Sequence, residues 1–536
     1  MNAKKRIAVL VLMSLVLAIC TVGCGRQQVV LIRQTDTQSG SDTVAASDSG
    51  VEPNTGADSG SGLTDSGTSV ATDSNVNESD SASGDSDSML NDTDSHSGDT
   101  GSAEVATDSD PYATDTDSHV ACQMSEGRIR IREIDVGQTV VVNSDEAALK
   151  PVAISPVAGG GSRVAWMGEG SSVHVTTLNE NDEIVQNTLA FPAHDFQDIY
   201  ATQDGGVLLL TRDATGGGIL NCGDENNLCN VPDDAIPCFN MVMVKFDDHG
   251  EIWEAPLTGA DDVPPYSTAP DGPATTLIWW YAHHGRIASN GDTFAAYFGS
   301  AISISTGSCI NIHQGDRMRI VSKAGEIQEG GFGWGCSPSG YEQLIWNSVA
   351  HAYVSVCKSE NATSGIAAFA PDMAVIWNVD PWYGNLGELV LASDGGYWLA
   401  LSDRKPGQPE RSSGLAEVRL LRFTSDEVSV QQTIPVAANI NARAPHLAEL
   451  GGDALLLLYE TSEAPGELSD VPNTQTLVEL RDAKDGSPIG EPLTVPNFKS
   501  NRYHALRAFP DGSAAIAVKG DGDTTIKILR VLSCDN

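Results

Sequence analysis

The sequence predicts an all-β fold, a seven-bladed β-propeller that follows a disordered N-terminal tether. The first observation is a recurring phrase in which two short apolar runs flank a tight turn, clearest at Asp204-Gly205, Asp394-Gly395 and Asp511-Gly512. The second is that such turns recur near residues 160, 204, 291, 350, 394, 451 and 511, while stretches with helical periodicity are few. Short strands joined by tight turns predict antiparallel sheets, and a four-strand unit repeated seven times predicts a propeller.

Two phrases within these units resemble the turn between the third and fourth strands of bacterial propeller repeats. They are Phe246–Trp253 and Arg481–Gly486. The repeats that they resemble include the quinoprotein type and those of secreted bacterial surface proteins. This resemblance extends over most of residues 122–534 and implies the propeller fold, without identifying a member of the family.

The N-terminus predicts export. Basic residues at positions 4–6 precede the apolar run Ile7–Ile19, which is typical of a signal peptide and short for a membrane span. Gly23-Cys24 resembles the lipobox of bacterial lipoproteins, which implies cleavage after residue 23 and acylation of Cys24. Ordinary secretion is the alternative. The residue after the cysteine is Gly rather than Asp, which by the same resemblance implies the outer membrane or cell surface.

A polar tether follows. Residues 34–120 contain 19 acidic residues and no Lys or Arg, so they cannot bury enough apolar surface to offset the entropy of ordering. Treated as a flexible coil, this segment spans roughly 50 Å. The predicted organisation is a signal peptide at 1–23, a lipid-anchored N-terminus at 24–33, the tether at 34–120 and the propeller at 121–536.

The charge of the chain excludes one class of partner. The formal net charge is -41, and residues 121–536 alone hold 53 acidic and 26 basic residues, a net of -27. No basic cluster follows residues 4–6, so nucleic-acid binding is not expected. We expect a monomer that meets the membrane through its lipid anchor and binds a protein or glycan ligand.

The ends of the predicted ring can close on each other. Residues 128–142 contain one strand, whereas the last unit stops after its third strand, at Thr525–Leu532. The early strand therefore completes the last blade. Cys122 and Cys534 stand just outside these two segments, so a bridge between them would close the ring, for about 4 to 5 kcal/mol in the chain-entropy model.

An even number of cysteines remains after the export segment, and in an exported protein this predicts four disulfides. If the first pairs with the last, one bridge must join the group at 222–238 to the group at 309–357. A metal site between Cys222 and Cys229 is the alternative, although their spacing is unusual for zinc. The eight residues are Cys122, Cys222, Cys229, Cys238, Cys309, Cys336, Cys357 and Cys534.

Oxygen ligands also stand close together in this loop. They offer a calcium site, although such a run is more often a polar loop. The residues are Asp224, Glu225, Asn226 and Asn227.

Loop lengths predict which face binds. The connections at 213–239, 258–283, 403–414 and 461–473 are long, and in a propeller these connection classes emerge on one face, here called the long-loop face. Aromatic side chains near it are candidate ligand contacts, and packing between blades is the commoner alternative. The candidates are Trp279, Trp280, Tyr281, Trp382 and Tyr383.

Three histidines stand where innermost strands begin. His284, His446 and His504 could hold a metal ion or move protons at the mouth of the central channel, and polar channel lining is the simpler alternative. No prosthetic cofactor is predicted. The residues suggest two possible ions, calcium and a metal bound in the channel.

The function expected from these features is ligand binding by a surface-exposed lipoprotein, without catalysis. The alternative is an extracytoplasmic propeller enzyme, a hydrolase, lyase or quinoprotein, that uses the histidines and acidic residues such as Glu388. A purely structural envelope component is a third alternative. Motifs of serine hydrolases, zincins and phosphate-binding loops are missing, although propeller enzymes assemble their sites from distant blades.

Overall fold

The computed structural model describes residues 122–534 with gaps, together with Val30–Leu31. The chain divides by its internal contacts into residues 1–36 with 120–536 and residues 37–119, and none of the second unit is described. The predicted signal peptide, Cys24 and the tether lie outside the described residues. The gaps are 143–150, 187, 213–239, 259–273, 278–283, 306–309, 333–335, 337–338, 360–365, 371–373, 380–382, 410–413, 452 and 467–473.

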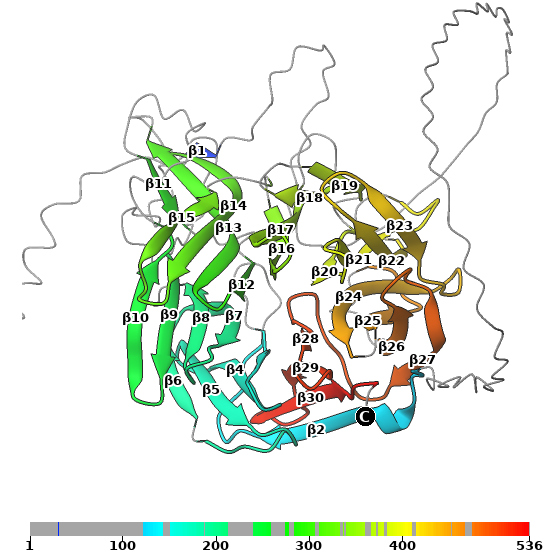
Figure 1. Cartoon of the computed structure of the whole chain (residues 1–536), viewed down its shortest axis with the longest axis horizontal. Coiled ribbons are helices and arrows are strands. Elements are labelled where there is room, and N and C mark those ends of the chain that lie inside the picture. The colour runs from blue at the N-terminus through cyan, green and yellow to red at the C-terminus, as the bar shows by residue number, and fades with distance from the viewer. Residues whose placement is uncertain are drawn as a thin grey trace, which may run out of the picture. The chain divides into compact units, whose positions relative to one another are not determined.

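The described chain is built almost wholly from antiparallel sheets, which confirms the all-β propeller (Figure 1). The described residues contain a single 3-10 turn, η1 (Glu126–Arg128), and no helix long and apolar enough to cross a membrane. Six sheets have four strands each and one has six.

The first three four-stranded sheets are given from their inner edge outward. They are β3 (Ala153–Pro156), β4 (Ser162–Gly168), β5 (Ser172–Leu178) and β6 (Leu189–Pro192); β7 (Asp195–Ala201), β8 (Val207–Arg212), β9 (Met241–Asp247) and β10 (Gly250–Pro256); and β16 (Ser339–Asn347), β17 (Ala352–Ser359), β18 (Ile366–Ala370) and β19 (Ala374–Asn378).

The other three follow the same order. They are β20 (Leu386–Leu391), β21 (Tyr397–Arg404), β22 (Ala416–Phe423) and β23 (Val428–Thr433); β24 (Asn441–Leu450), β25 (Ala454–Ser462), β26 (Gln475–Asp482) and β27 (Pro488–Val495); and β28 (Arg507–Ala508), β29 (Ala514–Lys519), β30 (Thr525–Val531) and β2 (Ile129–Asp135).

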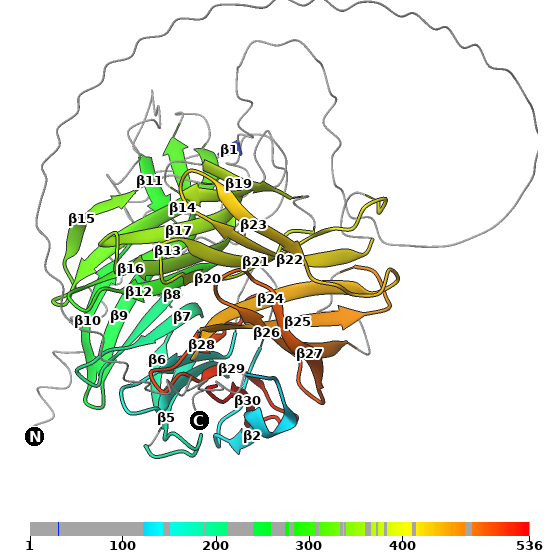
Figure 2. The same ribbon diagram turned by 45° about the vertical axis from the view of Figure 1, so that its right-hand side comes forward.

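The remaining sheet departs from the predicted unit, so the structure has six regular blades rather than seven. Its strands β13 and β14 form a hairpin of 13 residues a side, longer than β12 can cover. The part of β13 that extends beyond β12 pairs with β11, which lies in the connection at 258–283 that was expected to be a loop. Strand β14 pairs with β1 in parallel (Figure 2). The strands are β11 (Ala274–Leu277), β12 (Gly285–Ser289), β13 (Thr293–Ser305), β14 (Ile310–Ser322), β15 (Ile327–Phe332) and β1 (Val30–Leu31).

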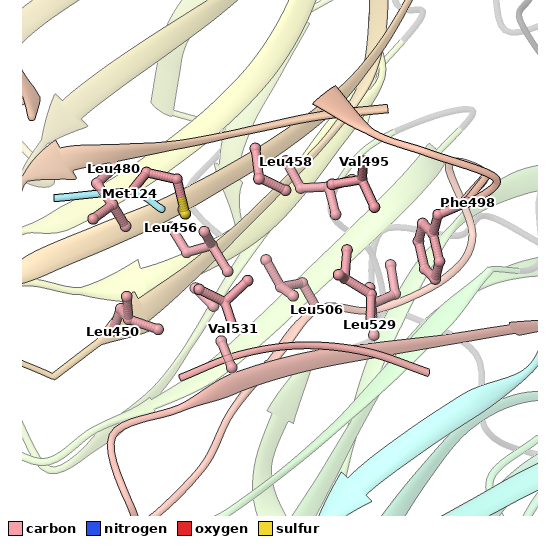
Figure 3. Close-up of a cluster of buried hydrophobic side chains, with 14 of the residues drawn as sticks. Met124, Leu450, Leu456, Leu458, Leu480, Val495, Phe498, Leu506, Leu529 and Val531 are labelled. Carbon is pink, nitrogen blue, oxygen red and sulfur yellow. The ribbon is translucent and has the colours of Figure 1, made fainter. Parts of the chain in front are cut away.

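The innermost strands form a ring. Strands β3, β7, β12, β16, β20, β24 and β28 contact one another in that order, and β28 returns to β3. Each pair of neighbouring sheets encloses a cluster of buried apolar side chains, because both faces of a propeller sheet are covered by the next sheet. Figure 3 shows the cluster between β24–β27 and β28–β30, which includes Leu456, Leu480 and Leu529.

The predicted tight turns join the first and second strands of the sheets. At Gly205, Gly395 and Gly512 the backbone has φ of 87°, 88° and 75°, a conformation in which glycine is favoured. The aspartate before each glycine accepts a hydrogen bond from the amide two residues on, as at Asp511 Oδ1 and Ser513 N, 2.9 Å apart. This is an Asx turn, and it explains why the Asp-Gly pair marks the turn.

The ring closes as predicted. Strand β2 pairs with β30 from Ile129 opposite Val531 to Asp135 opposite Thr525, and so supplies the outer strand of the last sheet. Beside this pair, Cys122 and Cys534 form a disulfide with a Cα–Cα distance of 5.3 Å.

A second disulfide joins Cys336 and Cys357, which are 21 residues apart. The other four cysteines, at 222, 229, 238 and 309, lie outside the described residues. Their pairing, including a bridge between the two groups, stays a prediction.

Replacing both Cys122 and Cys534 by serine should lower the free energy of unfolding by about 4 to 5 kcal/mol, because the bridge restricts almost the whole unfolded domain. Urea unfolding of the full chain measures this. The matched control is the pair Cys336→Ala and Cys357→Ala, which opens a short loop and should cost about 3 kcal/mol. A smaller loss for the ring-closing pair than for the control would contradict its role.

Candidate functional site

The innermost strands carry β-bulges close to where they begin. Pairing with the second strand shifts register between Phe196 and Asp198 in β7 and between Gly340 and Gln343 in β16. It shifts again after Leu386 in β20 and after Arg443 in β24. A bulge adds residues to one strand and redirects their side chains, and here it turns polar groups toward the channel.

Two bulge carboxylates join neighbouring blades. Asp198 Oδ2 on β7 accepts a hydrogen bond from Ile287 N on β12 at 3.0 Å. In the same way, Glu388 Oε2 on β20 accepts from Leu447 N on β24 at 2.8 Å. Both carboxylates are buried. Each therefore binds the backbone of the next innermost strand.

Arginine completes the partners of Asp198. Arg507 Nη2 on β28 donates to both oxygens of Asp198, at 2.5 and 2.6 Å. Glu342, which lies in the bulge of β16, forms an ion pair with His284, with Oε2 3.4 Å from Nδ1. Asp198 thus pairs with an arginine, and Glu342 lies beside a histidine.

A segment of the chain's own backbone fills the channel. Residues 499–506, here called the channel segment, lead from β27 into β28, which Figure 1 shows at the centre of the ring. Leu506 N donates to Glu388 Oε1 at 2.8 Å, and Arg286 Nη2 on β12 donates to His504 O at 3.2 Å. The ring of Tyr503 stacks on Tyr341 of β16 with centroids 5.8 Å apart. The channel segment therefore contacts several sheets at once.

His446 links Glu388 to this segment. Its Nδ1 lies 3.1 Å from Glu388 Oε1, and its Nε2 lies 3.0 Å from the carbonyl oxygen of Asn501. A carbonyl accepts only, so Nε2 donates to Asn501. Glu388 also accepts from the backbone amides of Leu447 and Leu506.

The same contacts keep Glu388 ionised. Burial alone would raise its pKa, but the charge and hydrogen bond of His446, the charge of Arg286 and the amide of Leu447 lower the pKa below 4.5. The pair of His446 and Glu388 is therefore a buried ion pair.

His504 is neutral by contrast. Its Nδ1 accepts a hydrogen bond from Asn501 N at 3.1 Å, so the proton resides on Nε2, which has no partner among the described residues. Burial, followed by the charges of His446 and Arg286, lowers the pKa of His504 to about 3.

The three predicted histidines are all buried beside or within the channel segment: His446 contacts Asn501, His504 belongs to the segment, and the ring of His284 lies 5.5 Å from that of Tyr503. Within the described part of the chain, however, the group of potential metal ligands whose atoms lie within 4.8 Å of one another consists of Asp316, Cys336 and Cys357. Those two cysteines form a disulfide. A metal ion held by the histidines stays a prediction.

Of the predicted aromatic contacts, the structure describes Tyr383. Its side chain is fully buried, its hydroxyl accepts from Gly414 N at 2.8 Å, and its ring lies 4.7 Å from the guanidinium carbon of Arg443. Tyr383 therefore fastens the connection between β21 and β22, which is the packing role. Residues 279–281 and Trp382 lie outside the described residues, as do residues 224–227.

The long-loop face carries a pocket that the sequence did not reveal. It has a volume of about 540 Å³ and lies between two sheets, where β26 begins, β27 and β29 end and β30 begins. These strand ends are those from which the long connections leave. The sequence contains one sign of this pocket, which is the presence of lysines at 499, 519 and 527 in an acidic domain. The lining residues are Thr474, Gln475, Thr494, Val495, Pro496, Asn497, Phe498, Lys499, Val518, Lys519, Asp521 and Lys527.

Glu460 on β25 lies close to this pocket and to the channel segment. It is buried, and Ser500 Oγ donates to its Oε1 at 3.3 Å. Burial raises the pKa of Glu460 to about 8, against the charge of Lys499 and hydrogen bonds from Ser500. Glu460 therefore keeps its proton at neutral pH.

No family model matches the chain, and no curated protein matches it. Among solved structures, a streptogramin B lyase is 12% identical, with 75% of this chain and 97% of that chain covered and a TM-score of 0.36. A GH93 α-L-arabinofuranosidase of Fusarium graminearum with arabinobiose is 9% identical, with 74% and 96% covered and a TM-score of 0.37. A Dyadobacter fermentans protein of unknown function is 11% identical, with 75% and 99% covered and a TM-score of 0.36. At this level the likeness carries no argument about function.

The stability of the domain should fall as pH rises from about 4.5 to about 8, because folded Glu460 holds a proton that the unfolded chain releases. This contribution changes by about 1.4 kcal/mol per pH unit. In the Glu460→Gln variant, the free energy of unfolding measured in urea should not show this fall with pH. An unchanged pH dependence in the variant would show that Glu460 ionises normally.

His504 should act in the opposite direction. Its pKa is lowered from 6.5 to about 3, so the unfolded chain binds the extra proton first and stability is lost as pH falls below 6.5. His504→Asn, whose amide oxygen can replace Nδ1 as acceptor, should weaken this acid dependence in urea unfolding. Equal acid dependence in both proteins would contradict the neutral imidazole.

Proposed function

We propose that the chain is a surface-exposed lipoprotein, anchored in the outer membrane through Cys24, whose propeller binds a macromolecule or glycan without catalysis. The ligand site is the long-loop face. The tether at 34–120 would carry the propeller away from the lipid, and the protein acts as a monomer.

The pocket on the long-loop face is the observation that carries this proposal. It is concave, lies at the predicted face and is lined by described residues from two sheets. Its volume of about 540 Å³ lies within the range of about 300 to 1,000 Å³ that is usual for ligand sites.

We count the six-stranded sheet as the seventh blade of this propeller. Strands β12 to β15 keep the order of a regular blade, and β12 contacts β7 and β16 in the ring. Strands β11 and β1 are then additions to a blade.

A propeller enzyme is the second candidate. The buried ion pair of His446 and Glu388, with the neutral His504 beside it, resembles an acid and base set at a channel mouth. Metal analysis and an absorption spectrum of the full chain, purified without chelator, separate the two functions. Stoichiometric metal or quinone that is lost in His446→Ala would favour the enzyme.

Filling the pocket should weaken binding. Thr494→Trp places a large ring at an exposed lining position, and should reduce binding of the full chain to arrays of bacterial glycans and envelope proteins by roughly tenfold. The matched control is Lys484→Trp, an exposed residue in the turn at the opposite end of β26 and β27. Equal signals from Thr494→Trp and the unmodified chain would exclude this pocket as the site.

A further inference from the structure

We propose that Glu460 controls one wall of the pocket, which stays closed while this carboxyl holds its proton and opens when the proton leaves. The inference names a regulation of the site of the proposed function. It rests on that proposal for the ligand, whereas its test needs no ligand.

This wall of the pocket runs directly into the channel segment. Residues 495–499, here called the pocket wall, line the pocket without interruption, and Lys499 is also the first residue of the channel segment. The carbonyl oxygen of Phe498 accepts a hydrogen bond from Thr476 Oγ1 on β26 at 2.7 Å. A displacement of the residues that follow Lys499 therefore also moves the pocket wall.

Titratable side chains hold the two residues that follow the pocket wall. Ser500 donates to Glu460 through Oγ, at 3.3 Å, and through its backbone amide. Asn501 N donates to His504 Nδ1 at 3.1 Å, and the carbonyl oxygen of Asn501 accepts from His446 Nε2 at 3.0 Å. The pocket wall thus ends in backbone whose hydrogen bonds depend on protonation.

Glu460 ionises only at a cost while the pocket wall is closed. It is buried, and burial raises its pKa to about 8. Among the described residues, Lys499 supplies the charge that acts on this carboxyl. The residue opposite on β26 is the neutral Thr476, and the residue opposite on β24 is Arg443, whose guanidinium carbon lies 4.7 Å from the ring of Tyr383. Opening of the pocket wall would let water reach the carboxylate.

Opening and ionisation are therefore linked. The carboxyl releases its proton near pH 8 when it is buried and near pH 4.5 when it is exposed to water. Each pH unit between these values then favours the open form by about tenfold. His504 acts in the opposite direction, but only below pH 6.5, where an exposed imidazole binds a proton. Between pH 6.5 and 8, the effect of Glu460 is no longer opposed by that of His504.

Hydrogen exchange of the full chain, measured by mass spectrometry at pH 6.5 and 8, tests the inference. The rates are divided by those of an unfolded chain at the same pH, and the amides of Ser500 and Asn501 are compared. We expect their protection to fall by roughly thirtyfold between the two pH values, at about tenfold per pH unit. In Glu460→Gln, which keeps a carbonyl acceptor and cannot ionise, their protection should stay constant.

The matched control is Glu417→Gln, which removes a buried carboxyl from β22 in another sheet. Burial raises the pKa of Glu417 as well, but this residue does not hold the pocket wall, so the variant should keep the thirtyfold fall. Strand β25 is the internal reference, because it should stay more protected than Ser500 and Asn501 at both pH values.

Three results would overturn the inference. They are no fall in the unmodified chain, an equal fall in Glu460→Gln, and equal protection of β25 and the two amides, since the pocket wall would then open only with the whole domain. These results are separate from the arrays. If Thr494→Trp leaves array binding unchanged, the proposed ligand site is wrong, and hydrogen exchange still decides whether Glu460 controls the pocket wall.

Discussion

Closure of the ring is the constraint on which the rest of the structure depends. Each sheet buries apolar side chains on both faces, so every sheet needs two neighbours and the first must meet the last. The last sheet takes three strands, β28 to β30, from one part of the chain, and β2 supplies its fourth strand from more than 380 residues before β30. The disulfide between Cys122 and Cys534 holds this joint at the one place where the ring has two free ends. Without the joint, the faces of β3 and β30 would lose their cover first.

The sequence could predict what depends on local chemistry. Asp-Gly pairs favour tight turns, so the positions of the first turns followed from the residues. The closing strand and the bridge of Cys122 with Cys534 followed from the strand missing in the last unit and from the position of the two cysteines beside it. The long β13–β14 hairpin was not predicted, because its additional partner β11 lies within the connection at 258–283, which was interpreted as a loop. The role of Tyr383 was also hidden, because an aromatic residue near a loop looks the same whether it packs or binds.

The channel shows why the site was harder to predict than the fold. His284, His446 and His504 are all buried next to or within the channel segment. Their partners come from bulges in other blades and from that segment, which no local pattern marks. Burying an ion pair such as His446 and Glu388 is costly unless every remaining hydrogen bond is made, and here backbone amides and a carbonyl make them. These bonds hold the channel segment in one conformation. Removing either Glu388 or His446 would leave the other buried without its partner.

The pocket and the channel divide the polar groups of the propeller into two kinds. In the channel, Asp198 and Glu388 accept hydrogen bonds from backbone amides of neighbouring strands and lie against Arg507 and His446. On the long-loop face, Lys519 donates to the carbonyl oxygen of Val140, and Lys527 donates to that of Asn497 and lies against the carboxylates of Asp521 and Glu133. The channel groups therefore tie the innermost strands to one another, whereas the lysines line a pocket at the ends of the outer strands.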